Sequence, residues 1–212
     1  MSVHRGGVFI LIPAAGGSTR MRGRDKLLED VGGTPLLARQ VRVALSTGAF
    51  VGVTFDPGGP PARLTALSLV ADPRIMAIPV PNAAEGMSAS LARGAVAADT
   101  LGGDAAPGGI MVLPADMPEI DAEDLKKLCA AFETAPDQIV RAVSSDGTPG
   151  HPVIFPRRCF AALAVLTGDA GARSVLEGEE VTLVPLAGNH ATLDLDTPED
   201  WAAWRGARSS QG

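Results

Sequence analysis

The chain has 212 residues with a formal net charge of −6, from 18 Lys and Arg against 24 Asp and Glu, and this composition indicates one soluble, mildly acidic globular domain. Its 4% aromatic content and lack of tyrosine remove the charge and the stacking surfaces that nucleic-acid-binding proteins use. No apolar run approaches the roughly 18 residues that span a bilayer, so we expect no nucleic-acid partner and no membrane partner.

Short apolar runs alternate with helical patterns along the chain, which is typical of a parallel sheet covered by helices on both faces. The first run, residues 8–12, follows Arg5 and precedes small residues, so it also resembles a signal peptide. We favour a strand because the run is short. Strands are predicted at residues 8–12, 50–54, 75–79, 110–113, 139–142, 152–155 and 181–185.

The best-defined helical pattern follows Gly32-Gly33, with Thr34 predicted as the N-cap, Pro35 as the first helical residue and Gly48 as the end. Its apolar residues form one stripe at helical spacing. Further helices are predicted at residues 87–98, 122–132, 158–166 and 171–177. The segments rich in proline and glycine, 57–61 and 102–109, are predicted to be loops.

The first predicted strand runs into a loop of small residues, followed by four cations within seven positions: Arg20, Arg22, Arg24 and Lys26. Small residues let backbone N–H groups approach a polyanion and cations neutralise it, so this segment indicates phosphate binding at the carboxyl end of a strand. Neither G-x-x-x-x-G-K-[ST] nor G-x-G-x-x-G occurs here, which excludes a P-loop and a dinucleotide-binding fingerprint. A solvated surface loop is the alternative interpretation.

Asp116 lies between two prolines directly after a predicted strand. A carboxylate held there can bind a divalent cation against phosphate oxygens. It can also simply start a turn.

Asp194 and Asp196 form a second acidic feature. If this segment is extended, both carboxylates project to one face and Leu195 projects to the other. Such paired charge favours a bound cation or a raised pKa. The next two residues, Thr197 and Pro198, have the residue types of an N-cap and a first helical position.

The two cysteines, Cys129 and Cys159, form no CxxC pair. This pattern argues against a zinc knuckle and against a secreted disulfide framework, and it favours a reducing compartment. We expect a cytoplasmic location.

Six segments occur in a fixed order along the chain. They are Ala14-Ala15-Gly16 with Arg20-Met21 and Lys26-Leu27-Leu28, Gly86-Met87-Ser88-Ala89-Ser90-Leu91, Pro114-Ala115-Asp116-Met117-Pro118, Gly150-His151-Pro152, Gly168-Asp169-Ala170-Gly171-Ala172-Arg173 and Asp194-Leu195-Asp196-Thr197-Pro198. This ordered series resembles the MobA-like nucleotidyltransferase family over about residues 8–204, with the greatest likeness to its molybdenum cofactor cytidylyltransferases. Pro13 stands where leucine is more usual, and residues 22–25 depart from the commoner Met-Gly-x-x-Lys run.

The resemblance implies a Rossmann-like three-layer α/β fold with a mostly parallel mixed sheet, as a single domain over residues 1–212. It implies an Mg²⁺-dependent enzyme that transfers a nucleoside monophosphate from a nucleoside triphosphate to a phosphorylated acceptor and releases pyrophosphate. CTP and molybdopterin, or its molybdenum-bearing form, are the implied substrates. The alternatives are transfer to a sugar phosphate or another cofactor precursor, and a nucleotide-binding module without turnover.

The resemblance also assigns roles to individual residues. The catalytic residues would be Lys26, Arg20 and Asp116, and the metal ligands Asp116, Asp194 and Asp196. The nucleotide-binding residues would be Ala15, Gly16, Gly17, Ser18, Gly86, Ser88 and Ser90. The acceptor-binding residues would be His151, Asp169 and Arg173.

Overall fold

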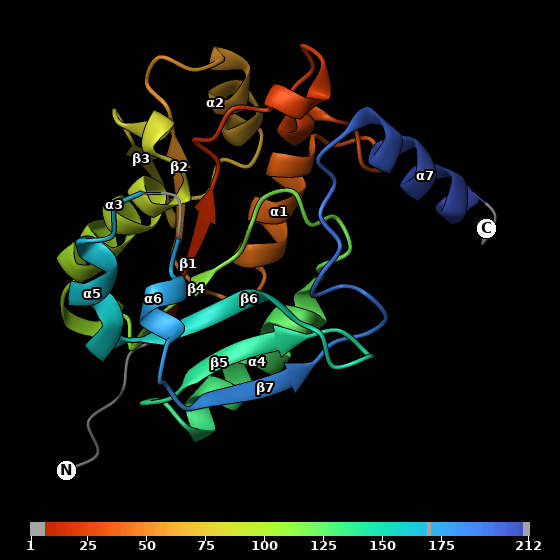
Figure 1. Cartoon of the computed structure of the whole chain (residues 1–212). Coiled ribbons are helices and arrows are strands. Elements are labelled where there is room, and N and C mark those ends of the chain that lie inside the picture. The colour runs from red at the N-terminus through yellow and green to blue at the C-terminus, as the bar shows by residue number, and fades with distance from the viewer. Residues whose placement is uncertain (1–6, 169–170, 210–212) are drawn as a thin grey trace.

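A seven-stranded sheet lies at the centre of the computed structural model, which describes residues 7–168 and 171–209 (Figure 1). The strands follow the order β3-β2-β1-β4-β6-β5-β7 across the sheet. All seven predicted strands are present, at or near their predicted bounds. They are β1 (Val8–Pro13), β2 (Val51–Phe55), β3 (Ile75–Pro79), β4 (Gly109–Val112), β5 (Ile139–Val143), β6 (Pro149–Pro156) and β7 (Val181–Pro185).

The sheet is mixed, because β6 runs antiparallel to both of its neighbours, β4 and β5, while the other four strand pairs are parallel. This confirms the mostly parallel mixed sheet that the resemblance implies. The alternating pattern by itself indicated a wholly parallel sheet, which is wrong for β6. The connection from β5 to β6 spans only residues 144–148, too few for the crossover that a parallel neighbour requires.

Helices cover both faces of the sheet, and β1 shows why. Its Ile10 and Ile12 side chains pack against α1 and α4, whereas Phe9 and Leu11 pack against α3 and α5 on the other face. Alternation along a strand thus gives two cores and three layers, as predicted. The helices are α1 (Leu36–Leu45), α2 (Pro61–Ser68), α3 (Met87–Thr100), α4 (Ala122–Thr134), α5 (Phe160–Ala164), α6 (Arg173–Leu176) and α7 (Pro198–Ser209).

The predicted start of α1 is wrong by one position. Pro35, not Thr34, is the N-cap, and α1 ends at Leu45, before Gly48. Pro35 is extended, with φ −55° and ψ 138°, because it forms an isolated bridge with Asp30. This bridge holds the residue outside the helix.

Two further helical predictions need correction, and one helix was not predicted. Segment 158–166 divides into a 3₁₀ turn at Arg157–Cys159 and the short α5, and segment 171–177 contains helix only at α6. Gly171 has φ +57°, which keeps it out of α6. Helix α2 was missed, because the proline-rich segment predicted as a loop ends with Pro61 at a first helical position, where proline is well tolerated.

None of the helices in the described part of the chain has the length and apolar character that crossing a membrane requires.

Substitutions at two helical glycines, one in α3 and one in α7, would test how closely α3 packs on the sheet. A Cβ at Gly94 would lie 2.2 Å from Leu11 Cδ2, whereas a Cβ at Gly206 of α7 would meet nothing within 4 Å. Each Gly→Ala change gains about 0.5–1 kcal/mol of helix propensity, but overpacking at Gly94 costs about 1–3 kcal/mol. We expect Gly206→Ala to raise the melting temperature and Gly94→Ala to lower it. An increase for both variants, measured by circular dichroism, would contradict the packing.

Candidate functional site

The site lies where two loops meet at the carboxyl edge of the sheet. Strand β1 lies between β2 and β4, so the loop after β1 and the loop after β4 leave the sheet side by side. From β1 the chain continues to β2 and β3 on one side of β1, whereas β4 and the later strands lie on its other side (Figure 1). Such a switch point is where ligands bind in open α/β sheets. It brings the small-residue loop, residues 13–18, beside Asp116.

Lys26 joins the two loops to a third segment. Its Nζ donates to Asp116 Oδ2 at 2.5 Å and to Asp196 Oδ1 at 2.6 Å. Arg20 Nη2 lies 2.7 Å from Asp196 Oδ2, and the Arg20 side chain is 68% exposed. The Leu195 N–H donates to the Asp116 carbonyl at 3.1 Å. The structure therefore brings together Lys26, Arg20, Asp116 and Asp196, as the sequence analysis proposed.

Three carboxylates gather on this edge. Ligand oxygens of Asp116, Asp194 and Asp196 all lie within 4.8 Å of one another. Burial and then the charges of Asp116 and Asp196 raise the pKa of Asp194. Burial opposes ionisation of Asp196, but Lys26 and Arg20 hold the pKa of that carboxyl below its usual value. A close set of oxygen ligands with excess negative charge fits Mg²⁺ or Mn²⁺.

The alternation predicted for residues 194–196 is confirmed by burial. Leu195 is 1% exposed and packs with Met21, Leu36 and Trp201, while the aspartates on either side of it face the cluster. Pro198 begins α7 as predicted. Helix α7 therefore fixes the acidic segment by burying the residue between the two aspartates.

A pocket of about 160 Å³ adjoins the cluster. Its lining residues come from the loop after β1, from the start of α3 and from the loop after β4. The Ala14 N–H donates to Thr54 Oγ1 at 3.1 Å, and that hydroxyl donates to Ser90 Oγ at 3.2 Å, which ties the first two segments together. The lining includes the candidate nucleotide residues Gly16, Gly17, Gly86 and Ser90, together with Lys26 and Asp116.

The remaining candidate nucleotide residues lie elsewhere. Ala15 and Ser18 line a larger pocket of about 500 Å³ on the α2 side of the loop, which Gly16 and Gly17 also border. Ser88 is fully buried, and its Oγ has no hydrogen-bond partner among the described residues. Ser88 therefore does not face either pocket directly.

His151 lies at the start of β6 with a buried imidazole. Burial, followed by the charge of Arg141, lowers its pKa, so the ring is neutral near pH 7. Its Nδ1 has no hydrogen-bond partner in the described part of the chain. The His151 N–H donates to the Ala191 carbonyl at 2.8 Å, and a Cβ on Gly150 would lie 1.8 Å from that oxygen. The segment before Asp194 thus rests directly on the Gly150-His151 backbone.

Only one of the last two acceptor-binding candidates lies in the described part of the chain. Asp169 lies outside the described residues. Arg173 is exposed at the start of α6 and makes no hydrogen bond or ion pair with a described residue.

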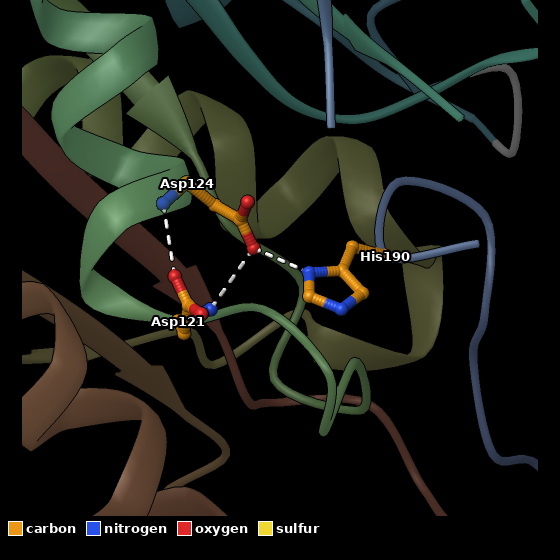
Figure 2. A group of neighbouring side chains, drawn as sticks. All are labelled: Asp121, Asp124 and His190. Atoms are coloured by element: carbon orange, nitrogen blue, oxygen red, sulfur yellow. Dashed lines mark hydrogen bonds and ion pairs between the residues drawn. The ribbon is translucent and has the colours of Figure 1, made fainter. Parts of the chain in front are cut away.

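A second acidic group lies outside this site, and its structural role is clear. Figure 2 shows Asp121 and Asp124 forming a capping box at the start of α4, with His190 beside Asp124. The distance from His190 Nδ1 to Asp124 Oδ2 is 2.7 Å. The sequence analysis missed this group, although Asp at N-cap and an acidic residue three positions later signal a capping box. His190 anchors the loop that leads from β7 to Asp194.

Comparisons with known proteins identify the family and the fold. The family described as the MobA-like NTP transferase domain matches residues 10–184. The purine catabolism protein PucB of Bacillus subtilis (strain 168) is 32% identical over 132 residues, which are 60% of this chain and 60% of PucB. The match thus spans less than two thirds of that relative's length.

Solved structures with the same fold include two that match nearly the whole chain. One is the Mycobacterium tuberculosis Rv0371c homolog from Mycobacterium sp. strain JC1, with a TM-score of 0.76, 26% identity and coverage of 98% of this chain and 100% of that chain. The other is CMP:2-keto-3-deoxy-manno-octonic acid synthetase complexed with CTP, with a TM-score of 0.70, 15% identity and coverage of 98% and 100%. The second likeness shows the fold alone.

The ion pairs of Lys26 generate a prediction about metal binding. Lys26→Met removes the positive charge beside Asp116 and Asp196, so the more negative site should bind Mn²⁺ several-fold more tightly than the wild type. Isothermal titration with Mn²⁺ measures this. Lys126→Met, which removes an exposed ion pair with Glu123, is the control and should leave affinity unchanged. Equal or weaker Mn²⁺ binding by Lys26→Met would contradict the described charge balance.

Proposed function

Because the chain belongs to the MobA-like NTP transferase domain family, we propose that it transfers CMP from CTP to a phosphorylated acceptor and releases pyrophosphate. We propose molybdopterin, or its molybdenum-bearing form, as the acceptor. The observation that carries the proposal is the Lys26 ammonium, which contacts Asp116 and Asp196 beside the small-residue loop. A cytoplasmic location and a single catalytic domain are part of the same proposal.

The small-residue loop supports nucleotide binding through its unused donors. In the described part of the chain, no group accepts a hydrogen bond from the backbone N–H of Ala15, Gly16, Gly17 or Ser18. Consecutive free N–H groups in a loop form a concave site for anions. Phosphate oxygens of the triphosphate would satisfy these donors.

The reaction needs positioning and charge neutralisation more than a protein nucleophile. A phosphate oxygen of the acceptor, already anionic near pH 7, attacks the α-phosphorus of CTP. The new oxygen–phosphorus bond forms as the bond from the α-phosphorus to the bridging oxygen breaks, and pyrophosphate leaves with its electron pair. Negative charge grows on the non-bridging oxygens and the leaving group, where Lys26 and Arg20 would stabilise it.

Three carboxylates would hold the divalent cation that this chemistry uses. Asp116, Asp194 and Asp196 have the oxygen ligands and the excess charge that Mg²⁺ requires. When bound, Mg²⁺ supplies positive charge against the phosphate oxygens. A protein that only bound nucleotides would not need this arrangement of carboxylates and cations, which favours catalysis over simple binding.

The acceptor side of the site would involve His151. Its neutral imidazole supplies no positive charge, and its Nδ1 is buried, so the ring would reach the acceptor only if binding exposed that atom. Contacts from Asp169 and Arg173 stay predictions.

The metal assignment predicts a large effect of Asp116→Asn. The amide keeps the shape of the side chain but removes the charge that holds Mg²⁺, so turnover should fall by about 100-fold or more, with the fold intact. Pyrophosphate release at limiting Mg²⁺ measures turnover, and circular dichroism checks folding. Asp99→Asn, which breaks an exposed ion pair with Arg157, is the control. Near-normal turnover of Asp116→Asn would remove Asp116 from the metal site.

The proposed base preference predicts the outcome of a competition. With equal CTP and GTP, Mg²⁺ and molybdopterin, the cytosine dinucleotide should exceed the guanine product about tenfold, since a misfitted base loses about 1–3 kcal/mol per buried hydrogen bond. Mass spectrometry separates the products. Predominance of the guanine product would overturn the CTP assignment, and pyrophosphate release only with sugar phosphates would overturn the acceptor.

A further inference from the structure

Arg63 of α2 is a buried arginine that the proposed chemistry does not use. Its side chain is 7% exposed. Arg63 lines the larger pocket, of about 500 Å³, whereas Lys26 lines the smaller pocket beside the carboxylates, so the two cations lie on different sides of the small-residue loop. A buried guanidinium is costly unless its donors are paired. The partners of Arg63 therefore show what this residue holds in place.

The guanidinium donates from all three of its nitrogens. Nε and Nη2 form a bidentate pair with Asp25 at 2.6 and 2.9 Å, and Nη2 also lies 3.2 Å from Ser18 Oγ. Nη1 donates to the carbonyls of Ala14 and Gly16, both at 2.7 Å. Burial opposes ionisation of Asp25, but Arg63 keeps its pKa below the usual value, so the pair stays charged.

The two carbonyl contacts fix the direction of the loop's donors. In a trans peptide the C=O and the following N–H point in opposite directions. When Arg63 binds the carbonyls of Ala14 and Gly16, the N–H groups of Ala15 and Gly17 must point away from Arg63. Those two N–H groups have no acceptor in the part of the chain that the structure describes.

The same network reaches Lys26. Asp25 precedes Lys26 in the sequence, and its Oδ1 accepts from Ser18 Oγ at 2.9 Å. That hydroxyl in turn accepts from the Lys26 N–H at 3.2 Å. Arg63 therefore holds the backbone on both sides of the loop, at Ala14 and at Lys26.

We propose that Arg63 is a positioning residue for the nucleotide, whose guanidinium binds two loop carbonyls and so aims the N–H groups of Ala15 and Gly17 at the triphosphate. This inference rests on the proposed nucleotidyl transfer and deepens it. A lysine could not replace Arg63, because an ammonium lacks the planar fork that serves a carboxylate and two carbonyls together.

The test compares CTP binding in the presence of Mg²⁺, measured by isothermal titration without any acceptor. Arg63→Ala and Arg63→Lys should each weaken CTP binding about tenfold or more, which corresponds to about 1.4 kcal/mol. Arg74→Ala is the matched control. Arg74 also pairs with an aspartate, Asp72, and donates to a carbonyl, that of Leu45, but it directly precedes β3 and so lies at the amino ends of the strands, away from the site. The Arg74→Ala variant should bind CTP as the wild type does.

Chemical rescue separates positioning from general stability. Guanidinium ion at millimolar concentration should restore part of the CTP affinity of Arg63→Ala, because the adjoining pocket of about 500 Å³ is lined by Arg63 and gives access to the vacated position. The same ion should not improve Arg74→Ala. If Arg63→Ala fails to fold, Arg63→Lys provides the comparison at matched circular dichroism.

The outcomes distinguish this inference from the proposed function. Wild-type CTP affinity in a folded Arg63→Lys or Arg63→Ala variant would overturn the positioning role. Equal losses in the Arg63 and Arg74 variants would overturn it as well. If the wild-type protein bound no nucleoside triphosphate, the proposed function itself would fail.

Discussion

The site depends on the contacts of the Lys26 ammonium with Asp116 and Asp196. Asp116 lies 90 residues after Lys26 in the sequence, and Asp196 lies 170 residues after it. Without this positive charge, three carboxylates would repel one another at one sheet edge. With it, Asp116 and Asp196 are neutralised by cations, and Asp194 is left with a raised pKa. The arrangement therefore places a fixed cation beside residual negative charge, which the proposed function assigns to phosphate oxygens and to a divalent metal ion.

Much of this arrangement could be predicted from the sequence. The seven strands appear as short apolar runs, because strands buried on both faces carry apolar residues at successive positions. Period-two alternation placed Asp194 and Asp196 together, since Leu195 between them had to be buried. The order of motifs, through the family resemblance, assigned Asp116 to the metal ion and the small-residue loop to the nucleotide, and the structure has the two side by side.

The rest depends on contacts between distant segments, which leave no local pattern. Arg63 comes from α2, a helix that starts at the last proline of a proline-rich segment and was not predicted. The spacing of its partners, at positions 14, 16, 18 and 25, does not indicate that a guanidinium binds them. His190 likewise has no motif around it, and only the fold places it on Asp124. Strand β6 is antiparallel because its connection to β5 is short. The sequence pattern predicted this strand to start at residue 152, whereas β6 starts at Pro149, so the connection is shorter than predicted.

In the proposed function, the carboxylates around Lys26 hold the metal ion and the metal ion contacts the nucleotide. A crystal structure with Mn²⁺ and a nonhydrolysable CTP analogue, using the anomalous signal of manganese, tests this directly. We expect an anomalous peak at Asp116, Asp194 and Asp196, with triphosphate oxygens of the analogue against the same ion. A manganese peak at Asp121, Asp124 and His190 instead, with the triphosphate away from Lys26, would contradict it.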